Sequence, residues 1–204
     1  EAVSAAGGRI STQSGTAMDI LAKSLDAEKN ANLINKVTAS GHNSVVEHTY
    51  FNLAFQNVSV IVEQFVIEFR LASFTVKSRR YVDFSDAGFY IPEFNDDKLK
   101  SDYISHMNEM FASYMKLTEL GIPKEDARFL LPYCLFSNFL CSANGREFLH
   151  LIKAMIYGRG KDIPEIHSLG LQLYKQAKEI APGLMKDFDE RAKNYRDKAD
   201  FSFV

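Results

Sequence analysis

The chain has 204 residues, of which 46% are hydrophobic and 25% charged, the balance of a soluble globular domain with one sizeable core. A net charge of −2 and a pI of about 6.2 give no overall positive field to attract nucleic acid or an anionic membrane. No apolar run approaches the roughly 20 residues that cross a bilayer. Cys134 and Cys141 lack metal-ligand spacing, which predicts reduced thiols and a cytoplasmic protein.

Periodic patterns predict the elements of the first third of the chain. Apolar residues at helical spacing predict helices over residues 16–25 and 28–40, the second stopped by Gly41. Alternating aromatic residues predict a strand over 49–58. A helix that Ser59 can cap is expected next, ending at Arg70.

The rest of the chain is predicted to alternate between extended and helical segments. Residues 69–81 lack helix formers and predict extended chain or loop. The remaining predictions are a short strand over 89–94, a helix over 97–120, a helix over 124–131 begun by Pro123 and closed by Pro132, a strand over 133–143, and helices over 144–157 and 163–180.

Helices outnumber strands, and the strands are separated by helices, which predicts an α+β fold with a small mixed β-sheet carrying helices. We expect a single domain over residues 1–204, with a core over about 6–174 and a helical C-terminal extension over 175–204. The chain begins without Met and ends on the apolar run Phe201–Val204, so we expect it to be a piece of a longer polypeptide.

The densest polar cluster comes at the predicted helix end before the first strand. It contains His42, Ser44, Glu47 and His48, and such a junction can present hydrogen-bonding groups to a ligand. The two histidines are six residues apart, which matches no usual zinc spacing, so no metal site is expected. Helix capping and hydrogen bonds within the core are the alternative roles for these side chains.

Three basic groups lie where they could meet an anion. The run Lys77–Tyr81 carries guanidinium forks that suit a phosphate, or forms a solvated basic loop. Arg128 lies among apolar residues and needs an anionic partner, either a carboxylate or a ligand. Residues 144–146 begin a helix, where backbone N–H groups and Arg146 could face a pyrophosphate or Asn144 could serve as the N-cap.

Taken together, several short motifs resemble the flavin-dependent thymidylate synthase family in order and spacing. These motifs are Gly41-His42-x-Ser44-x-x-Glu47-His48, Val58-Ser59, Glu63-Gln64, Arg70 with Ser78 eight residues on, Arg79-Arg80-Tyr81, Ala127-Arg128, Leu131-Pro132 and Asn144-x-Arg146. The resemblance spans about residues 6–174, and it includes the possibility that the chain is one half of a tandem-duplicated member.

The resemblance implies an enzyme that moves the methylene of methylenetetrahydrofolate onto dUMP, with FAD as hydride carrier and NADPH as reductant. It also implies a homotetramer in which FAD lies across subunit interfaces, and it implies neither a nucleic acid nor a membrane partner. The residues on flavin-binding positions are His42, Ser44, Glu47, Arg70, Asn144, Arg146 and His150. The residues on dUMP-binding positions are Ser78, Arg80 and Arg128.

This chain departs from the family pattern at several of those positions. The usual Arg-His-Arg motif reads Glu68-Phe69-Arg70. The same frame puts Phe65 where a Gln is usual, Val76 where a Glu is usual, His150 where an Asn is usual, and Met155 where an Arg that polarises the uracil is usual. Because Met155 stands where the family has its uracil-polarising Arg, the resemblance assigns no catalytic residue in this chain.

Three hypotheses follow from the retained and missing residues. The first is an active thymidylate synthase whose departures are covered by neighbouring residues. The second is a non-catalytic or half-site domain that binds ligand or assembles with an active copy, so that binding outlasts chemistry. The third is a nucleic-acid or protein-interaction module that uses Lys77, Arg79, Arg80 and Lys161.

Overall fold

A computed structural model describes residues 1–195, so the predicted extension is described only up to residue 195, and its last residues, with the run Phe201–Val204, lie outside the described part. The chain divides into two compact units. Unit 1 comprises Glu1–Asn52 and, of the described residues, 142–195, and unit 2 comprises Leu53–Cys141. The two boundaries between the units, after Asn52 and after Cys141, each fall within a β-strand. A single domain over residues 1–204 stays a prediction.

The sheet has three strands in the order β1-β3-β2, so β3 is central. These strands are β1 (Tyr50–Ser59), β2 (Ala72–Val76) and β3 (Phe136–Asn144). Alternate residues of β3, from Ser137 to Ala143, are buried, as expected for a strand with one face on the core. On β1 the alternation slips at Asn57, whose φ of 50° marks a local break in the regular strand.

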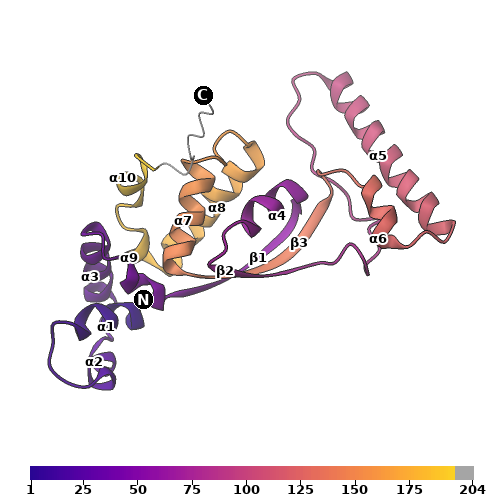
Figure 1. Ribbon diagram of the computed structural model, residues 1–204. Coiled ribbons are helices and arrows are strands. Elements are labelled where there is room, and N and C mark those ends of the chain that lie inside the picture. The colour runs from indigo at the N-terminus through magenta and orange to yellow at the C-terminus, as the bar shows by residue number, and fades with distance from the viewer. Residues whose placement is uncertain (196–204) are drawn as a thin grey trace, which may run out of the picture. The chain divides into compact units, whose positions relative to one another are not determined.

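Unit 1 gathers helices from both ends of the chain (Figure 1). Helix α7 packs on α8 and on the short helix η1, while α1 packs on α2, α3 and η1, and α9 packs on α3 and α8. These elements are α1 (Ala2–Ile10), α2 (Ala17–Lys23), α3 (Ala27–Ala39), η1 (Asn43–His48), α7 (Gly145–Ile156), α8 (Pro164–Ile180), α9 (Pro182–Met185) and α10 (Phe188–Ala192).

Unit 2 packs its own core around Phe84, Phe111, Tyr114 and Leu135. The Tyr114 side chain is fully buried, and its hydroxyl accepts a hydrogen bond from the backbone N–H of Phe84 at 3.4 Å. The remaining elements of this unit are α4 (Val60–Ile67), α5 (Asp97–Glu119), α6 (Lys124–Ala127) and η2 (Arg128–Leu130).

The structure confirms the α+β class, with a small sheet and many helices. The predicted strand over 89–94 is wrong, because Phe89 makes only an isolated bridge with Leu135 and Pro92 can donate no further ladder bond. The strand expected over 133–143 begins at Phe136. Helix α4 ends at Ile67, before Arg70, and the helix expected over 124–131 turns into 3₁₀ geometry at Arg128.

Candidate functional site

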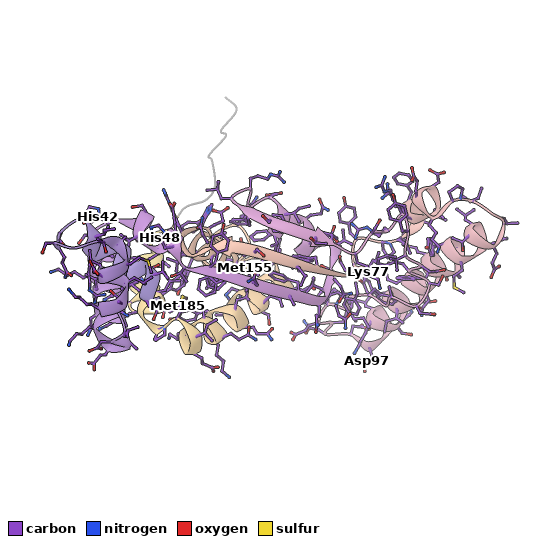
Figure 2. All side chains as sticks on the ribbon, turned by 90° about the horizontal axis from the view of Figure 1, so that it is seen from below. His42, His48, Lys77, Asp97, Met155 and Met185 are labelled. Atoms are coloured by element: carbon purple, nitrogen blue, oxygen red, sulfur yellow. The ribbon has the colours of Figure 1, made fainter. Side chains whose placement is uncertain are left out.

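The polar cluster near residue 42 is held at a helix end by a Schellman motif. The backbone N–H of His42 bonds to the carbonyl of Val37 at 2.9 Å, and that of Gly41 bonds to Thr38 at 3.0 Å. Gly41 adopts a φ of 85°, which is accessible to glycine without strain. Helix α3 therefore stops at a fixed point, and η1 begins directly after it. Figure 2 shows His42 and His48 at the opposite ends of η1.

Helix α7 begins in direct contact with η1. The backbone N–H of Gly145 donates to the carbonyl of Thr49 at 2.7 Å. A Cβ at residue 145 would lie 2.5 Å from the carbonyl oxygen of Val46, so only glycine allows this approach. Asn144 is the N-cap of α7 and accepts from the N–H of Glu147 at 3.0 Å. The capping role proposed for Asn144 is thus confirmed, and two N–H groups of the first turn are already satisfied.

Close packing of η1 on α7 brings Glu47 and Arg146 together. The Nη1 atom of Arg146 donates to Oε1 of Glu47 at 2.9 Å, and the two side chains are 59% and 39% exposed. His42 and Ser44 are exposed beside them on η1. Five of the seven predicted flavin residues, His42, Ser44, Glu47, Asn144 and Arg146, therefore lie at one junction of unit 1.

His150 lies one turn further along α7. Its Nδ1 is 3.5 Å from Oε2 of the buried Glu147, and its ring meets that of Tyr195 edge to face at 5.9 Å between centroids. Tyr195 follows α10, and the His150 side chain remains 49% exposed beside it. This predicted flavin residue is thus partnered within unit 1.

The other predicted ligand residues belong to unit 2. Arg70 is exposed and Ser78 is half-buried. The Ser78 hydroxyl accepts the backbone N–H of Arg80 at 3.2 Å, which turns the chain after β2. The guanidinium of Arg80 lies 5.2 Å from the centroid of the Tyr81 ring.

Arg128 lies in the wall of a pocket of about 280 Å³. Its Nε donates to the carbonyl of Glu125 at 2.8 Å. No carboxylate pairs with it among residues 1–195, and its guanidinium carbon lies 5.6 Å from the centroid of the Phe129 ring. The other lining residues are Val60, Gln64, Arg79, Phe129, Leu131, Pro132, Tyr133 and Leu135. The pocket thus brings Arg128 together with Arg79, while Ser78 and Arg80 do not line it.

Sequence patterns missed the buried carboxylate behind that pocket. Glu63 in α4 is only 2% exposed. Its two oxygens accept from Nη1 and Nη2 of Arg79 at 2.8 and 2.7 Å, and Oε2 also accepts from the hydroxyl of Ser137. In the sequence Glu63 stood out only as part of the family motif Glu63-Gln64 and as the one carboxylate of a largely apolar helix, Val60–Ile67.

The electrostatics of this network follow from its hydrogen bonds. Burial alone would raise the pKa of the Glu63 carboxyl, but the bonds from Arg79 and Ser137 outweigh burial and hold that pKa below its usual value. The bonds to Glu63 likewise raise the pKa of Arg79. Both groups are therefore charged at neutral pH.

Three residues at the departures from the family pattern are buried. Phe65 and Phe69 are 7% and 5% exposed, and their ring centroids lie 5.7 Å apart. Met155 is fully buried where α7 meets α8, so closely that a Cβ at Gly170 would lie 2.7 Å from the Cβ of Met155. Figure 2 places Met155 in α7. At these three positions, where the resemblance leads one to expect polar side chains, the chain has apolar side chains that pack in the core.

The described residues contain neither a metal-binding cluster nor a membrane-spanning helix. No group of three His, Cys, Asp or Glu side chains is arranged to hold a metal ion within residues 1–195. Within the same residues no helix is long and apolar enough to cross a membrane. No disulfide joins Cys134 and Cys141, and Sγ of Cys134 lies 3.3 Å from Sδ of Met107.

The protein thus has an α+β fold with an arginine-lined pocket in unit 2 and an exposed polar junction in unit 1. Residues 1–183 match the family described as "Thymidylate synthase complementing protein". The chain belongs to this family, which confirms the resemblance found in the sequence.

Proteins named "Flavin-dependent thymidylate synthase" are among its relatives. The one from Geobacter sulfurreducens is 29% identical over 174 residues, 83% of this chain and 74% of the relative. The one from Saccharolobus solfataricus is 26% identical over 148 residues, 72% of this chain and 56% of the relative. The chain thus spans little more than half the length of some of these relatives.

A solved structure shares the fold. It is described as the UMP/dUMP methylase PolB from Streptomyces cacaoi bound with 5-Br dUMP. The TM-score is 0.78 at 21% identity, covering 93% of this chain and 90% of that one.

Proposed function

We propose that this chain is a flavin-dependent thymidylate synthase of the cytoplasm that converts dUMP to dTMP. In this proposal methylenetetrahydrofolate donates the carbon and NADPH is the reductant. The observation that carries it is the family match over residues 1–183, combined with an arginine-lined pocket of unit 2 at one of the predicted dUMP residues, Arg128.

The pocket suits a nucleotide monophosphate. Arg128 has no carboxylate partner among the described residues, and Arg79 lines the same wall. A phosphate oxygen is the ligand that a planar guanidinium prefers, because its N–H groups match the anion's geometry. Phe129 and Tyr133, which also line the pocket, offer apolar surface to a pyrimidine ring.

The η1–α7 junction suits a flavin dinucleotide. Arg146 is 59% exposed despite its bond to Glu47, so part of its guanidinium is open to a ligand. His42 and Ser44 add exposed donors, and this set of groups matches a pyrophosphate and the sugar next to it. The residues proposed to hold FAD are His42, Ser44, Glu47, Arg70, Asn144, Arg146 and His150. FAD when bound would supply the hydride that reduces the transferred carbon.

We also propose that the working form is a homo-oligomer, a tetramer by the family resemblance, or a pair formed with a second copy of the domain. The support is the family resemblance, which implies a flavin site built across subunit interfaces. Flavin content against oligomeric state, measured by absorbance during size-exclusion chromatography with light scattering, tests this. Stoichiometric flavin on a strict monomer would contradict it.

A degenerate half-site domain is the second candidate, and the burial of Met155 favours it. A fully buried thioether cannot stabilise negative charge on a uracil as a guanidinium would. In that case the chain binds nucleotide and flavin and an active copy supplies the missing cation. Isothermal titration with dUMP, followed by a turnover assay on the same sample, separates the candidates, because only the first predicts turnover by the chain alone.

A further inference from the structure

Arg79 is fixed in place by a partner that lies out of reach of solvent. Both of its Nη atoms bind the carboxylate of Glu63, and Ser137 from β3 binds the same carboxylate. The bidentate arrangement leaves the guanidinium one orientation, because two parallel bonds define its plane. The Arg79 side chain is 20% exposed and that of Glu63 only 3%.

The exposed part of Arg79 belongs to the pocket wall. Arg79 lines the pocket of about 280 Å³ together with Arg128 and Gln64. A guanidinium carries more N–H donors than the two that Glu63 takes, so Arg79 can still donate to a ligand. The amide of Gln64 also lies 3.4 Å from the Glu63 carboxylate. One buried carboxylate therefore orients two residues of the wall.

Charge balance favours an anion in this pocket. Arg79 and Arg128 contribute two positive charges, and Glu63 behind Arg79 contributes one negative charge. The carboxylate is the more deeply buried member of its pair, so an anion in the pocket meets the guanidinium first. The neighbouring cations Lys77 and Arg80 do not line the pocket. Nζ of Lys77 lies 5.2 Å from the ring centroid of Phe84, and Cζ of Arg80 lies 5.2 Å from that of Tyr81.

We propose that Arg79 is a second guanidinium ligand, beside Arg128, for a phosphomonoester bound in this pocket, and that Glu63 is the positioning residue that aims it. The identity of that phosphomonoester as dUMP rests on the function proposed above. The anion site itself does not, because it stands on the pocket, the two arginines and the buried carboxylate.

The test is isothermal titration of the full chain with dUMP, inorganic phosphate and deoxyuridine. Arg79→Ala lowers the affinity for dUMP and for phosphate about ten- to a hundredfold and leaves that for deoxyuridine unchanged, because only the phosphate contact is lost. Lys77→Ala is the matched control, since it removes a cation two residues away that does not line the pocket. Its affinities stay within about threefold of wild type.

Glu63→Gln tests positioning. It weakens phosphate and dUMP binding in the same direction, and it adds nothing further in the Arg79→Ala background, because it acts through Arg79. A loss that persists in that background, or one that extends to deoxyuridine, would show a general structural role and overturn the proposal. Arg79→Lys covers the case in which Arg79→Ala does not fold. It keeps the charge but not the fork, so wild-type phosphate affinity in this variant also overturns the proposal.

The results separate this inference from the proposed function. Phosphate binding that depends on Arg79 in a chain without thymidylate synthase activity leaves the inference standing and removes the function. Turnover of dUMP by the chain, with phosphate affinity unchanged in the Arg79 variants, leaves the proposed function standing and overturns the inference. A wild-type chain that binds neither phosphate nor dUMP overturns the inference.

Discussion

Gly145 lies so close to Val46 that a Cβ on residue 145 would come within 2.5 Å of the Val46 carbonyl oxygen. The contact joins the first residue of α7 to the middle of η1, two elements about a hundred residues apart in the sequence. It allows the Glu47–Arg146 pair, which links the same two elements at 2.9 Å. The proposed flavin site therefore depends on one glycine.

Gly145→Ala is expected to destabilise the chain and weaken flavin binding. The added methyl group meets a backbone carbonyl that cannot move aside like a side chain, and such overpacking costs about 1–3 kcal/mol. Urea unfolding and fluorescence titration with FAD measure the two effects.

Gly8→Ala is the matched control for that variant. A Cβ there would have its nearest contact, Val45 Cγ1, at an ordinary 3.5 Å. Because Gly8 lies inside α1, alanine should stabilise the helix by about 0.5–1 kcal/mol. Equal stability losses in both variants would mean that the contact with Val46 is not special.

Arg146→Ala is expected to lower FAD affinity while leaving the free energy of unfolding nearly unchanged. The Glu47–Arg146 pair is solvent-exposed, and such pairs contribute about 0–1 kcal/mol. A lost charge-assisted contact to a pyrophosphate costs about 1.5–3 kcal/mol, or roughly ten- to a hundredfold in affinity. Lys29→Ala, which breaks the exposed pair with Asp26, is the control that should leave both quantities unchanged. Unaltered FAD affinity in Arg146→Ala would remove this residue from the site.

Arg128→Ala is expected to weaken dUMP binding about ten- to a hundredfold, because it removes a charge-assisted contact within the pocket. Arg80→Ala, at the other arginine that the resemblance places on dUMP, should weaken binding less, because Arg80 does not line the pocket. Isothermal titration gives the affinities, with Lys116→Ala on α5 as a control for lost charge. Wild-type affinity in both arginine variants would contradict the proposed nucleotide site.

Tyr157 should ionise at a higher pH than an ordinary tyrosine. Burial, followed by its 2.7 Å bond to Asp189, raises the pKa of this hydroxyl to about 12. Because the folded pKa exceeds the unfolded value of about 10, this group's stabilisation is complete below pH 10 and is lost as pH rises through about 12. Absorbance of tyrosinate at high pH should therefore show a late transition that Tyr157→Phe reduces by one tyrosine, since the pKa values of Tyr114 and Tyr174 are also raised.

Asp189→Asn provides the control for that titration. It keeps the shape of the side chain but removes the negative charge beside the phenol, so the late transition should move to lower pH. A transition at the same pH in this variant would mean that Asp189 does not contribute to the shift.

Local signals were enough to predict most elements. The apolar spacing of α3 and α5, the capping residues Ser59 and Asn144, and the aromatic alternation of β1 each act within a few residues. Residues 89–94 show the limit of such signals. Their composition favours a strand, but whether a strand forms depends on a neighbour with free ladder positions, and only Phe89 finds one.

The candidate site was predictable only in part. Sequence order placed His42, Glu47 and Arg146 on family positions, and the structure brings them together at the η1–α7 junction. The Glu63–Arg79 pair could not be foreseen, because it joins a helix to a loop after β2 and takes its third member, Ser137, from β3. Whether the predicted residues bind FAD and dUMP is decided by the measurements above.

Release of tritium from dUMP labelled at C5 is the most direct test of the proposed thymidylate synthase. The assay contains the purified chain, FAD, NADPH and methylenetetrahydrofolate, with the Geobacter sulfurreducens relative measured in parallel. We predict tritium release together with dTMP formation, both requiring every component of the assay. It should be slower than in the relative, because Met155 is buried and Glu68 and Phe69 replace polar family residues. Adding a second copy of the domain that carries the usual Arg-His-Arg motif should raise the rate of tritium release if the two copies form a common active site. A chain that binds FAD and dUMP yet releases no tritium would contradict the proposed thymidylate synthase activity and leave only the half-site domain.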